Sequence, residues 1–237
     1  MSEMARILAR VTAGRMLFRP PAFRRLLVLA PHPDDETVGC GGYVAWVAAQ
    51  GGMVTVLLLT SGEQAEEPSA DGRGDSVRQR EARKAATILG VQQVLCWSMP
   101  DGRLAMHKPP SEQLAALIDR LSPDVLLVPH TREIHSDHAA VGAYPIQTSV
   151  RHEPAIMTYE IWTPQEPNCL VNISEFMSVK LRAVQAYKSQ YEKYCLERLV
   201  SGLAEYRAAW SRMRSWRFAE GFRLFSLSEY RERADAY

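Results

Sequence analysis

From Leu26 onward, short apolar runs that suit buried strands alternate with windows in which apolar residues recur at helical spacing. The strand-like runs cover residues 25–30, 53–60, 93–97, 124–128 and 155–162. The helix-like windows cover residues 38–50, 77–89 and 111–121, and a further helix starts near residue 137. Because strand and helix alternate, the pattern predicts an α/β fold: a Rossmann-like, mostly parallel sheet with helices on both faces.

The last part of the chain follows a different pattern. Residues 174–220 are predicted to form a C-terminal helical segment, broken near Ser201-Gly202, whose apolar stripe packs on the core. Residues 222–225 are predicted to return as a short edge strand. We therefore expect residues 25–237 to form a single domain that includes this helical segment.

A basic extension of residues 1–24 precedes the predicted domain. The first 25 residues contain six arginines and one acid, Glu3. We favour docking of this extension on its own domain or on a neighbouring subunit of a homo-oligomer. Its apolar residues at helical spacing also suit peripheral contact with a membrane surface, which is the alternative.

Composition and charge narrow the class of protein. A hydrophobic fraction of 46% in 237 residues supplies the core of one large domain, and a net charge of +1 gives no reason to expect a nucleic-acid partner. The four cysteines lack a C-x-x-C pair, so we interpret them as reduced core residues. No apolar run reaches the roughly 18 residues of a membrane-spanning helix, and we expect a cytoplasmic protein.

Two clusters of polar side chains follow the first and fourth predicted strands. P-H-P-D-D-E occupies residues 31–36, and H-T-R-E-I-H-S-D-H occupies residues 130–138. In an open parallel sheet, ligands bind beyond the carboxyl ends of the strands, where the strand order reverses. We therefore expect both clusters to face one crevice.

The residue types in the two clusters suit a divalent metal. His32 and Asp35 are three residues apart, as are His135 and His138, so each pair is able to share one face of a turn. A catalytic zinc takes three nitrogen or oxygen ligands and leaves a fourth position open. Either cluster alone would also fit the start of a helix, and we interpret Glu36 as a first-turn acid only.

The two motifs P-H-P-D-D-E and H-S-D-H together resemble the PIG-L (LmbE-like) family of metal-dependent N-deacetylases. R-Q-R-E at residues 78–81 and P-D-G-R-L at residues 100–104 agree with the same family, and the resemblance covers residues 25–165. It implies that His32, Asp35 and His138 hold a zinc ion, although the same ligand set also suits Fe(II) or another divalent metal.

The resemblance also implies roles for the remaining polar side chains. Asp34 would be the general base that takes a proton from the attacking water, and His135, protonated, would stabilise the tetrahedral oxyanion. Asp137 would orient a histidine from behind the metal site. Three further residues are expected to contact the substrate: Arg78, Asp101 and Glu63.

The function implied is hydrolysis of the N-acetyl group of an amino sugar of the N-acetylglucosamine type, free or in a conjugate. An amidase for a larger N-acyl or thiol-conjugate substrate is one alternative, and a non-catalytic sugar-binding module is another. Other motifs are interpreted as structural: G-C-G-G at residues 39–42 as close helix packing, His130 as a loop residue near the crevice, and Trp162 as a core or interface residue.

Overall fold

The structure is a computed structural model that describes residues 16–62 and 76–234. Its centre is a seven-stranded sheet in the order β3-β2-β1-β4-β5-β7-β6. The strands are β1 (Arg25–Ala30), β2 (Met53–Thr60), β3 (Gln93–Met99), β4 (Val125–Pro129), β5 (Ala155–Tyr159), β6 (Cys169–Asn172) and β7 (Ala219–Phe225). Strands β1 to β5 pair in parallel, and β7 runs antiparallel to both β5 and β6. The predicted mostly parallel α/β sheet is confirmed.

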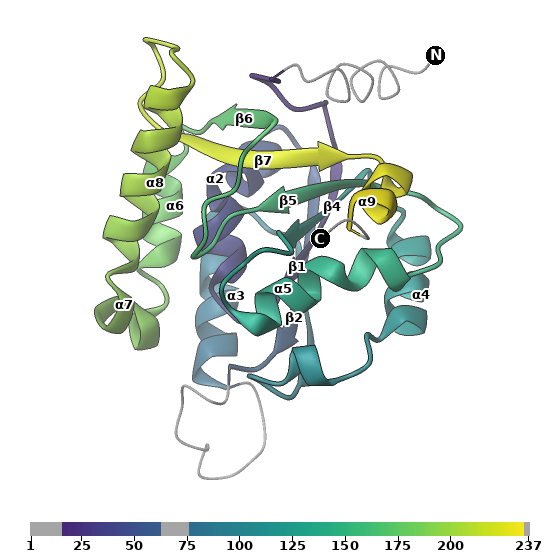
Figure 1. Ribbon diagram of the computed structural model, residues 1–237. Helices are drawn as coiled ribbons and strands as arrows, with labels where there is room; N and C mark the ends of the chain where they lie inside the picture. Colours follow the sequence, from purple (N-terminus) through teal and green to yellow (C-terminus); the bar gives the residue numbers. More distant parts are fainter. Residues whose placement is uncertain (1–15, 63–75, 235–237) are drawn as a thin grey trace.

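Helices cover both faces of this sheet (Figure 1). One face carries α2 (Asp35–Ala49), α3 (Val77–Leu89), α6 (Met177–Val184), α7 (Lys188–Tyr194) and α8 (Leu196–Trp210). The other face carries α4 (Ser111–Leu121), α5 (Ser136–Ala143) and α9 (Leu227–Ala234), with the 3₁₀ turns η2 (Leu104–Met106) and η3 (Tyr144–Gln147). Each face has its own apolar cluster, so the sheet is buried on both sides.

The strand order places the switch point of the sheet between β1 and β4. The chain proceeds outward from β1 through β2 to β3 on one side, and from β4 to β5 on the other. Such a reversal leaves a crevice at the carboxyl ends of the two central strands. Both polar clusters of the sequence begin at this point, directly after β1 and β4.

Helix boundaries follow local signals where those signals are strong. Ser76 caps α3 by accepting the N–H of Gln79 at 3.1 Å, and the Gln79 side chain accepts the Ser76 N–H at 2.9 Å, which completes a capping box. Gly90 ends the helix in the left-handed conformation with φ of 78°. The predicted range of residues 77–89 therefore agrees with the structure.

The C-terminal part differs from the prediction in three places. Ser201-Gly202 lies inside α8, and the helical segment instead breaks at residues 185–187 and at Cys195. The strand at residues 219–225 is not an edge strand, because β6 pairs along its outer side. Strand β6 and helix α9 were not predicted, since a four-residue strand gives almost no periodicity to detect.

The described part of the N-terminal extension docks on the domain. Leu17 forms a parallel bridge with Cys169 of β6, and Phe23 is buried in the core. The extension up to residue 15 lies outside the described residues. The expected docking on its own domain therefore holds for residues 16–24.

The glycines of α2 allow the helix to approach the sheet closely. A Cβ added to Gly39 would lie 2.2 Å from the ring of Tyr159, and one added to Gly42 would lie 2.7 Å from Ile173. This agrees with the packing interpretation of G-C-G-G.

The four cysteines are all free thiols, but they are not all core residues: Cys195 is exposed and Cys96 is half-buried. The prediction that all four lie in the core is wrong for these two. Within residues 16–62 and 76–234, none of the helices is both long and apolar enough to cross a bilayer.

Candidate metal centre

The end of β1 brings two of the predicted ligands together through a local turn. The Asp35 carboxylate accepts the backbone N–H of His32 at 2.9 Å, which folds the H-x-x-D stretch back on itself. Thr60, at the end of β2, fixes the turn by donating its N–H and its hydroxyl to the Pro31 carbonyl at 3.1 and 2.9 Å. His32 and Asp35 are both buried, so their side chains are held at the bottom of the crevice.

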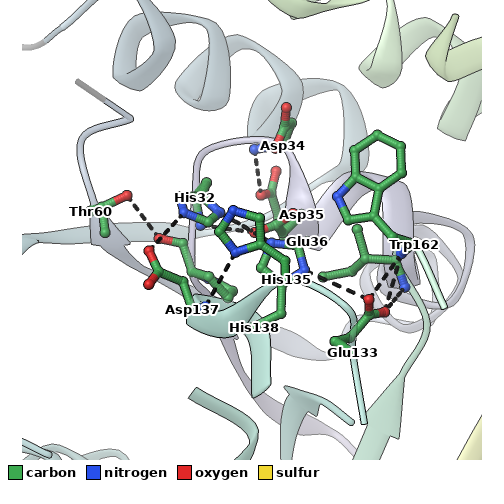
Figure 2. Close-up of polar contacts among 12 residues, drawn as sticks. His32, Asp34, Asp35, Glu36, Thr60, Glu133, His135, Asp137, His138 and Trp162 are labelled. Atoms are coloured by element: carbon green, nitrogen blue, oxygen red, sulfur yellow. Dashed lines mark hydrogen bonds and ion pairs between the residues drawn. The ribbon is translucent and has the colours of Figure 1, made fainter. Parts of the chain in front are cut away.

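His138, on the first turn of α5, completes a compact triangle of ligand atoms (Figure 2). His32 Nδ1 lies 3.2 Å from Asp35 Oδ2 and 3.2 Å from His138 Nε2, and His138 Nε2 lies 3.3 Å from Asp35 Oδ2. A tetrahedral ion with bonds of about 2.1 Å keeps its ligands about 3.4 Å apart. Two imidazoles and one carboxylate at this spacing fit a zinc-like ion.

The other side of the His32 ring faces two acids. His32 Nε2 lies 3.0 Å from Asp101 Oδ1 and 3.2 Å from Asp137 Oδ2. Asp137 also accepts the N–H groups of Gly102 at 2.7 Å and Leu104 at 2.9 Å, so both of its oxygens are engaged. These contacts suit orientation of the ring with its Nε2–H toward Asp137, which leaves Nδ1 free to act as a ligand.

The carboxylates around His32 create an environment that favours positive charge at this point of the cluster. Burial alone would lower the pKa of His32, but Asp101, Asp137 and Asp35 outweigh it and raise the pKa well above its usual value. Burial likewise would raise the pKa of Asp35, yet His138 and His32 hold it well below its usual range. An ionised carboxylate beside nitrogen ligands is the form that binds a cation.

Besides this triangle, two overlapping groups of side chains within the described residues are arranged closely enough to hold a metal ion. They are His32, His135 and His138, and His32, Asp101 and Asp137, with ligand atoms within 4.8 Å of one another in each group. In the second group the oxygens of Asp137 already accept backbone N–H groups. The set around His32 Nδ1 supplies two imidazole nitrogens and one carboxylate, a ligand combination that catalytic zinc sites use, and we favour it over the set around Nε2.

Asp34 sits beside this cluster in a strained backbone conformation. Its φ is 128° and its ψ is −27°, a region that residues other than glycine rarely occupy. Its carbonyl accepts the first helical N–H groups of α2, from Thr37 at 3.0 Å and Val38 at 2.8 Å. Strain of this kind persists where surrounding contacts impose it, and it concentrates at functional sites.

Arg78 fixes the side chain of Asp34. Its guanidinium lies 3.1 Å from Asp34 Oδ2 and donates to the Pro33 carbonyl at 2.8 Å. Burial, reinforced by the carboxylates of Asp35 and Glu36, raises the pKa of Asp34 to about 7, although Arg78 opposes the rise. Arg78 thus has a contact that the sequence did not predict, while it also lines the cavity expected to receive the substrate.

His135 caps α5 and lies at the mouth of the crevice. Its Nδ1 accepts the N–H of Asp137 at 3.2 Å, and its ring stacks on His138 with 4.6 Å between ring centroids. Burial and the neighbouring rings of His138 and His32 lower its pKa. Because Nδ1 accepts an N–H, a neutral His135 ring would carry its proton on Nε2, and the protonated state of His135 during the reaction stays a prediction.

Glu36 does more than occupy the first turn of α2, which corrects its interpretation as a first-turn acid only. It is buried, and it accepts the N–H of Asp34 at 3.2 Å, the hydroxyl of Thr37 at 2.6 Å and the hydroxyl of Tyr187. Tyr187 comes from the turn between α6 and α7. The C-terminal helical segment is thereby tied to the backbone of Asp34.

Glu133 is a site residue that the sequence analysis missed. Its buried carboxylate accepts the N–H groups of Ile161, Trp162 and Thr163 at 2.7, 3.1 and 3.1 Å, and its Oε2 lies 4.0 Å from His138 Nδ1 (Figure 2). Its place between two histidines in the sequence is the only signal that could have pointed to it. His130, expected to be a loop residue, is buried and donates its Nε2–H to the Thr163 carbonyl at 2.7 Å.

The cavity around the cluster has a volume of about 340 Å³. Its outer wall includes Trp162, Gln190, Lys193 and Tyr194, so helix α7 covers one side. Trp162 is 38% exposed, and it contacts the ring of Tyr194 edge-on with 5.8 Å between centroids. Trp162 is therefore not a core residue, and its place in an interface stays a prediction. Glu63 lies outside the described residues.

Fold and site together define an α/β protein with a candidate metal centre at the switch point of its sheet. The family model of PIG-L, described as GlcNAc-PI de-N-acetylase, matches residues 27–148. The chain belongs to the PIG-L family of deacetylases, as the two motifs predicted.

Individual relatives extend the similarity over most of the chain. The diacetylchitobiose deacetylase of Thermococcus kodakarensis is 28% identical over 221 residues, which cover 85% of this chain and 83% of the relative. A probable N-acetyl-alpha-D-glucosaminyl L-malate deacetylase 2 of Bacillus cereus is 26% identical over 186 residues, covering 71% of this chain and 84% of the relative. The solved N,N'-diacetylchitobiose deacetylase of Pyrococcus horikoshii has the same fold, with a TM-score of 0.78 at 23% identity over 96% of this chain and 94% of that one.

Proposed function

We propose that this protein is a metal-dependent deacetylase that hydrolyses the N-acetyl group of an N-acetylated amino sugar, free or in a conjugate. The observation that carries the proposal is the triangle of His32 Nδ1, Asp35 Oδ2 and His138 Nε2, with a strained, buried Asp34 beside it. The deacetylases among its relatives support the acetamide as the bond that is cleaved. The names of these relatives support an amino sugar as the amine.

We assign His32, Asp35 and His138 as the ligands of one divalent ion, and we favour zinc. When bound, such an ion polarises the acetyl carbonyl and makes water a stronger acid. Fe(II) accepts the same two-histidine, one-carboxylate set, so the metal is part of the proposal. Asp137, and Asp101 with it, would fix the His32 ring in the orientation that presents Nδ1 to the ion.

Asp34 is assigned as the general base that takes the proton of the attacking water. A base works best when its pKa lies near the working pH, and burial brings the pKa of Asp34 to about 7. The contacts of Asp34 with Arg78 and Glu36 would hold its carboxylate in one position during attack. The departing amine has to gain a proton, and we assign this transfer to Asp34 as well.

His135 is assigned to the opposite side of the acetyl group. As a neutral ring, whose Nδ1 is occupied by the Asp137 N–H, it would donate Nε2–H to the developing oxyanion. Arg78 and Asp101, in the cavity wall, remain our candidates for contact with the sugar hydroxyls. Glu63 stays a candidate from the sequence alone. The four free thiols suit a reducing compartment, and we propose the cytoplasm.

The proposal is tested by acetate release from a panel of substrates by zinc-loaded protein. The panel contains N-acetylglucosamine, diacetylchitobiose and the N-acetylglucosaminyl conjugate of malate, with N-butyrylglucosamine as the larger-acyl comparison. Release of acetate and a free amine from at least one acetylated sugar, lost in the Asp34→Asn variant, is expected. Turnover of the butyryl compound alone would favour the larger-acyl amidase, and no turnover with full metal binding would favour a sugar-binding module.

A further inference from the structure

A second cavity shares no lining residue with the cavity around the candidate metal centre. Its volume is about 260 Å³, and it is enclosed by the residues that follow β4, the loop after β5, the end of β7 and helix α9. Figure 1 shows that β7 leads directly into α9, and both elements contribute to the lining. The volume exceeds the ~30 Å³ share of one water molecule and falls just below the ~300 Å³ at which pockets for drug-sized ligands begin. It suits a small molecule.

Arg223 of β7 is the exceptional side chain in this cavity. Its Nε is buried and has no hydrogen-bond partner. Among residues 16–62 and 76–234, no carboxylate forms an ion pair with it; its guanidinium lies 5.2 Å from the centroid of the Phe225 ring. The Arg223 side chain as a whole is half-buried, and a guanidinium offers five donors, so its buried Nε–H without an acceptor carries a cost. The cost falls when an anion enters the cavity.

The other polar groups of the cavity already satisfy one another. Thr158 donates its hydroxyl to the Gln165 side chain at 2.7 Å, and the Gln165 amide donates back to the Thr158 carbonyl at 2.8 Å. The His130 ring is engaged at the Thr163 carbonyl. None of these groups neutralises Arg223. The ionised side chains of the lining are Arg223, Arg132 and the exposed Glu166, so its formal charge is +1.

We propose that this cavity binds a small oxyanion, a carboxylate or a phosphate, through Arg223. A planar guanidinium matches the paired oxygens of either group, so the two share one recognition chemistry. The site is separate from the metal centre, because no residue lines both cavities. The inference does not rest on the proposed deacetylase activity.

The test measures anion binding to the zinc-loaded full chain by calorimetry, at constant ionic strength set with chloride. Inorganic phosphate and acetate are titrated in separate experiments. Saturable binding of at least one is expected, weakened about tenfold or more in Arg223→Gln, a loss typical of a charged hydrogen-bonded pair. Arg217→Gln is the matched control, because Arg217 is exposed but also lies over an aromatic ring, that of Phe218, at 5.9 Å.

Two further measurements separate the alternatives. The His32→Ala variant should keep the Arg223-dependent binding, because an anion bound at the metal would be lost there. The Arg223→Lys variant keeps the positive charge but lacks the paired N–H donors of a guanidinium, and it should bind the anion with intermediate affinity. It takes the place of Arg223→Gln if that variant fails to fold. The proposal is overturned if neither anion binds saturably, if Arg217→Gln loses as much affinity, or if removing Arg223 alters only the oligomeric state.

Discussion

Asp34 is constrained at its backbone and at its side chain by several residues of the site. Its backbone is strained at φ of 128°, its carboxylate is paired with Arg78, and its N–H is held by Glu36. A side chain needed only to cap a helix would require none of this. The contacts therefore argue that the position of its carboxylate relative to His32 and Asp35 matters.

Replacing Asp34 by asparagine should separate metal binding from turnover. Asparagine keeps the shape of the side chain but cannot accept a proton at neutral pH. We expect kcat to fall by about 10²–10⁴-fold while the metal content stays at the wild-type level. His32→Ala, measured in parallel, should lose both metal and turnover. Wild-type kcat in Asp34→Asn would remove Asp34 from the role of base.

Arg78→Met should shift the pH dependence of the reaction. Arg78 lowers the pKa of Asp34, which burial otherwise raises, so its removal raises that pKa further. A base has to be deprotonated to act, and activity therefore rises as the pH passes its pKa. We expect the acidic limb of the kcat/KM profile to move to higher pH by about 1 unit or more. An unchanged limb, in a variant that still binds metal, would show that this limb does not report Asp34.

At the scale of elements, the glycines of α2 explain how the helix that follows the ligands reaches its position. Gly39 and Gly41 are matched for a test, because both lie in this helix. In Gly39→Ala the added Cβ would lie 2.2 Å from the Tyr159 ring and 2.9 Å from the carbonyl oxygen of Glu160. The Cβ of Gly41→Ala would have its nearest contact at 3.4 Å, with Lys180.

We expect Gly39→Ala to lower the free energy of unfolding by about 1–3 kcal/mol through overpacking. Gly41→Ala should be neutral or stabilising by up to ~1 kcal/mol, the helix-propensity gain of alanine over glycine. Urea unfolding of both variants measures the difference. Equal stabilities would mean that α2 is able to move away from β5, and that G-C-G-G is not required for close packing.

The elements that sequence could predict are those with strong local signals. The five parallel strands are long apolar runs, and α3 carries a capping box at one end and Gly90 at the other. The site motifs were predictable for the same reason, since they follow strand ends. The contact between Glu36 and Tyr187 was not predictable. The two residues are 151 positions apart, and the sequence around each gives no indication of the other. The exposure of Trp162 was not predictable, because composition alone does not distinguish a buried tryptophan from an exposed one.

At the scale of the whole molecule, a bound ion should stabilise the fold. Its ligands come from the ends of β1 and from α5, so the ion would join two distant parts of the chain. An ion at 100 times its Kd stabilises by about 2.7 kcal/mol. For a chain of this length we expect chelation to lower Tm by roughly 5–10 °C. His32→Ala should show no such shift in a calorimetric scan. If chelation leaves the Tm of the wild-type protein unchanged, the result would contradict an ion held jointly by residues after β1 and residues of α5.

The most direct test of the account is anomalous diffraction at the zinc edge from crystals of the zinc-loaded protein. We predict one strong peak at about 2.0–2.2 Å from His32 Nδ1, Asp35 and His138 Nε2, with Asp34 close by but not bound. A peak on the other side of the His32 ring, between Asp101 and Asp137, would contradict the assigned ligand set. Absence of any peak in this crevice would contradict the metal centre itself.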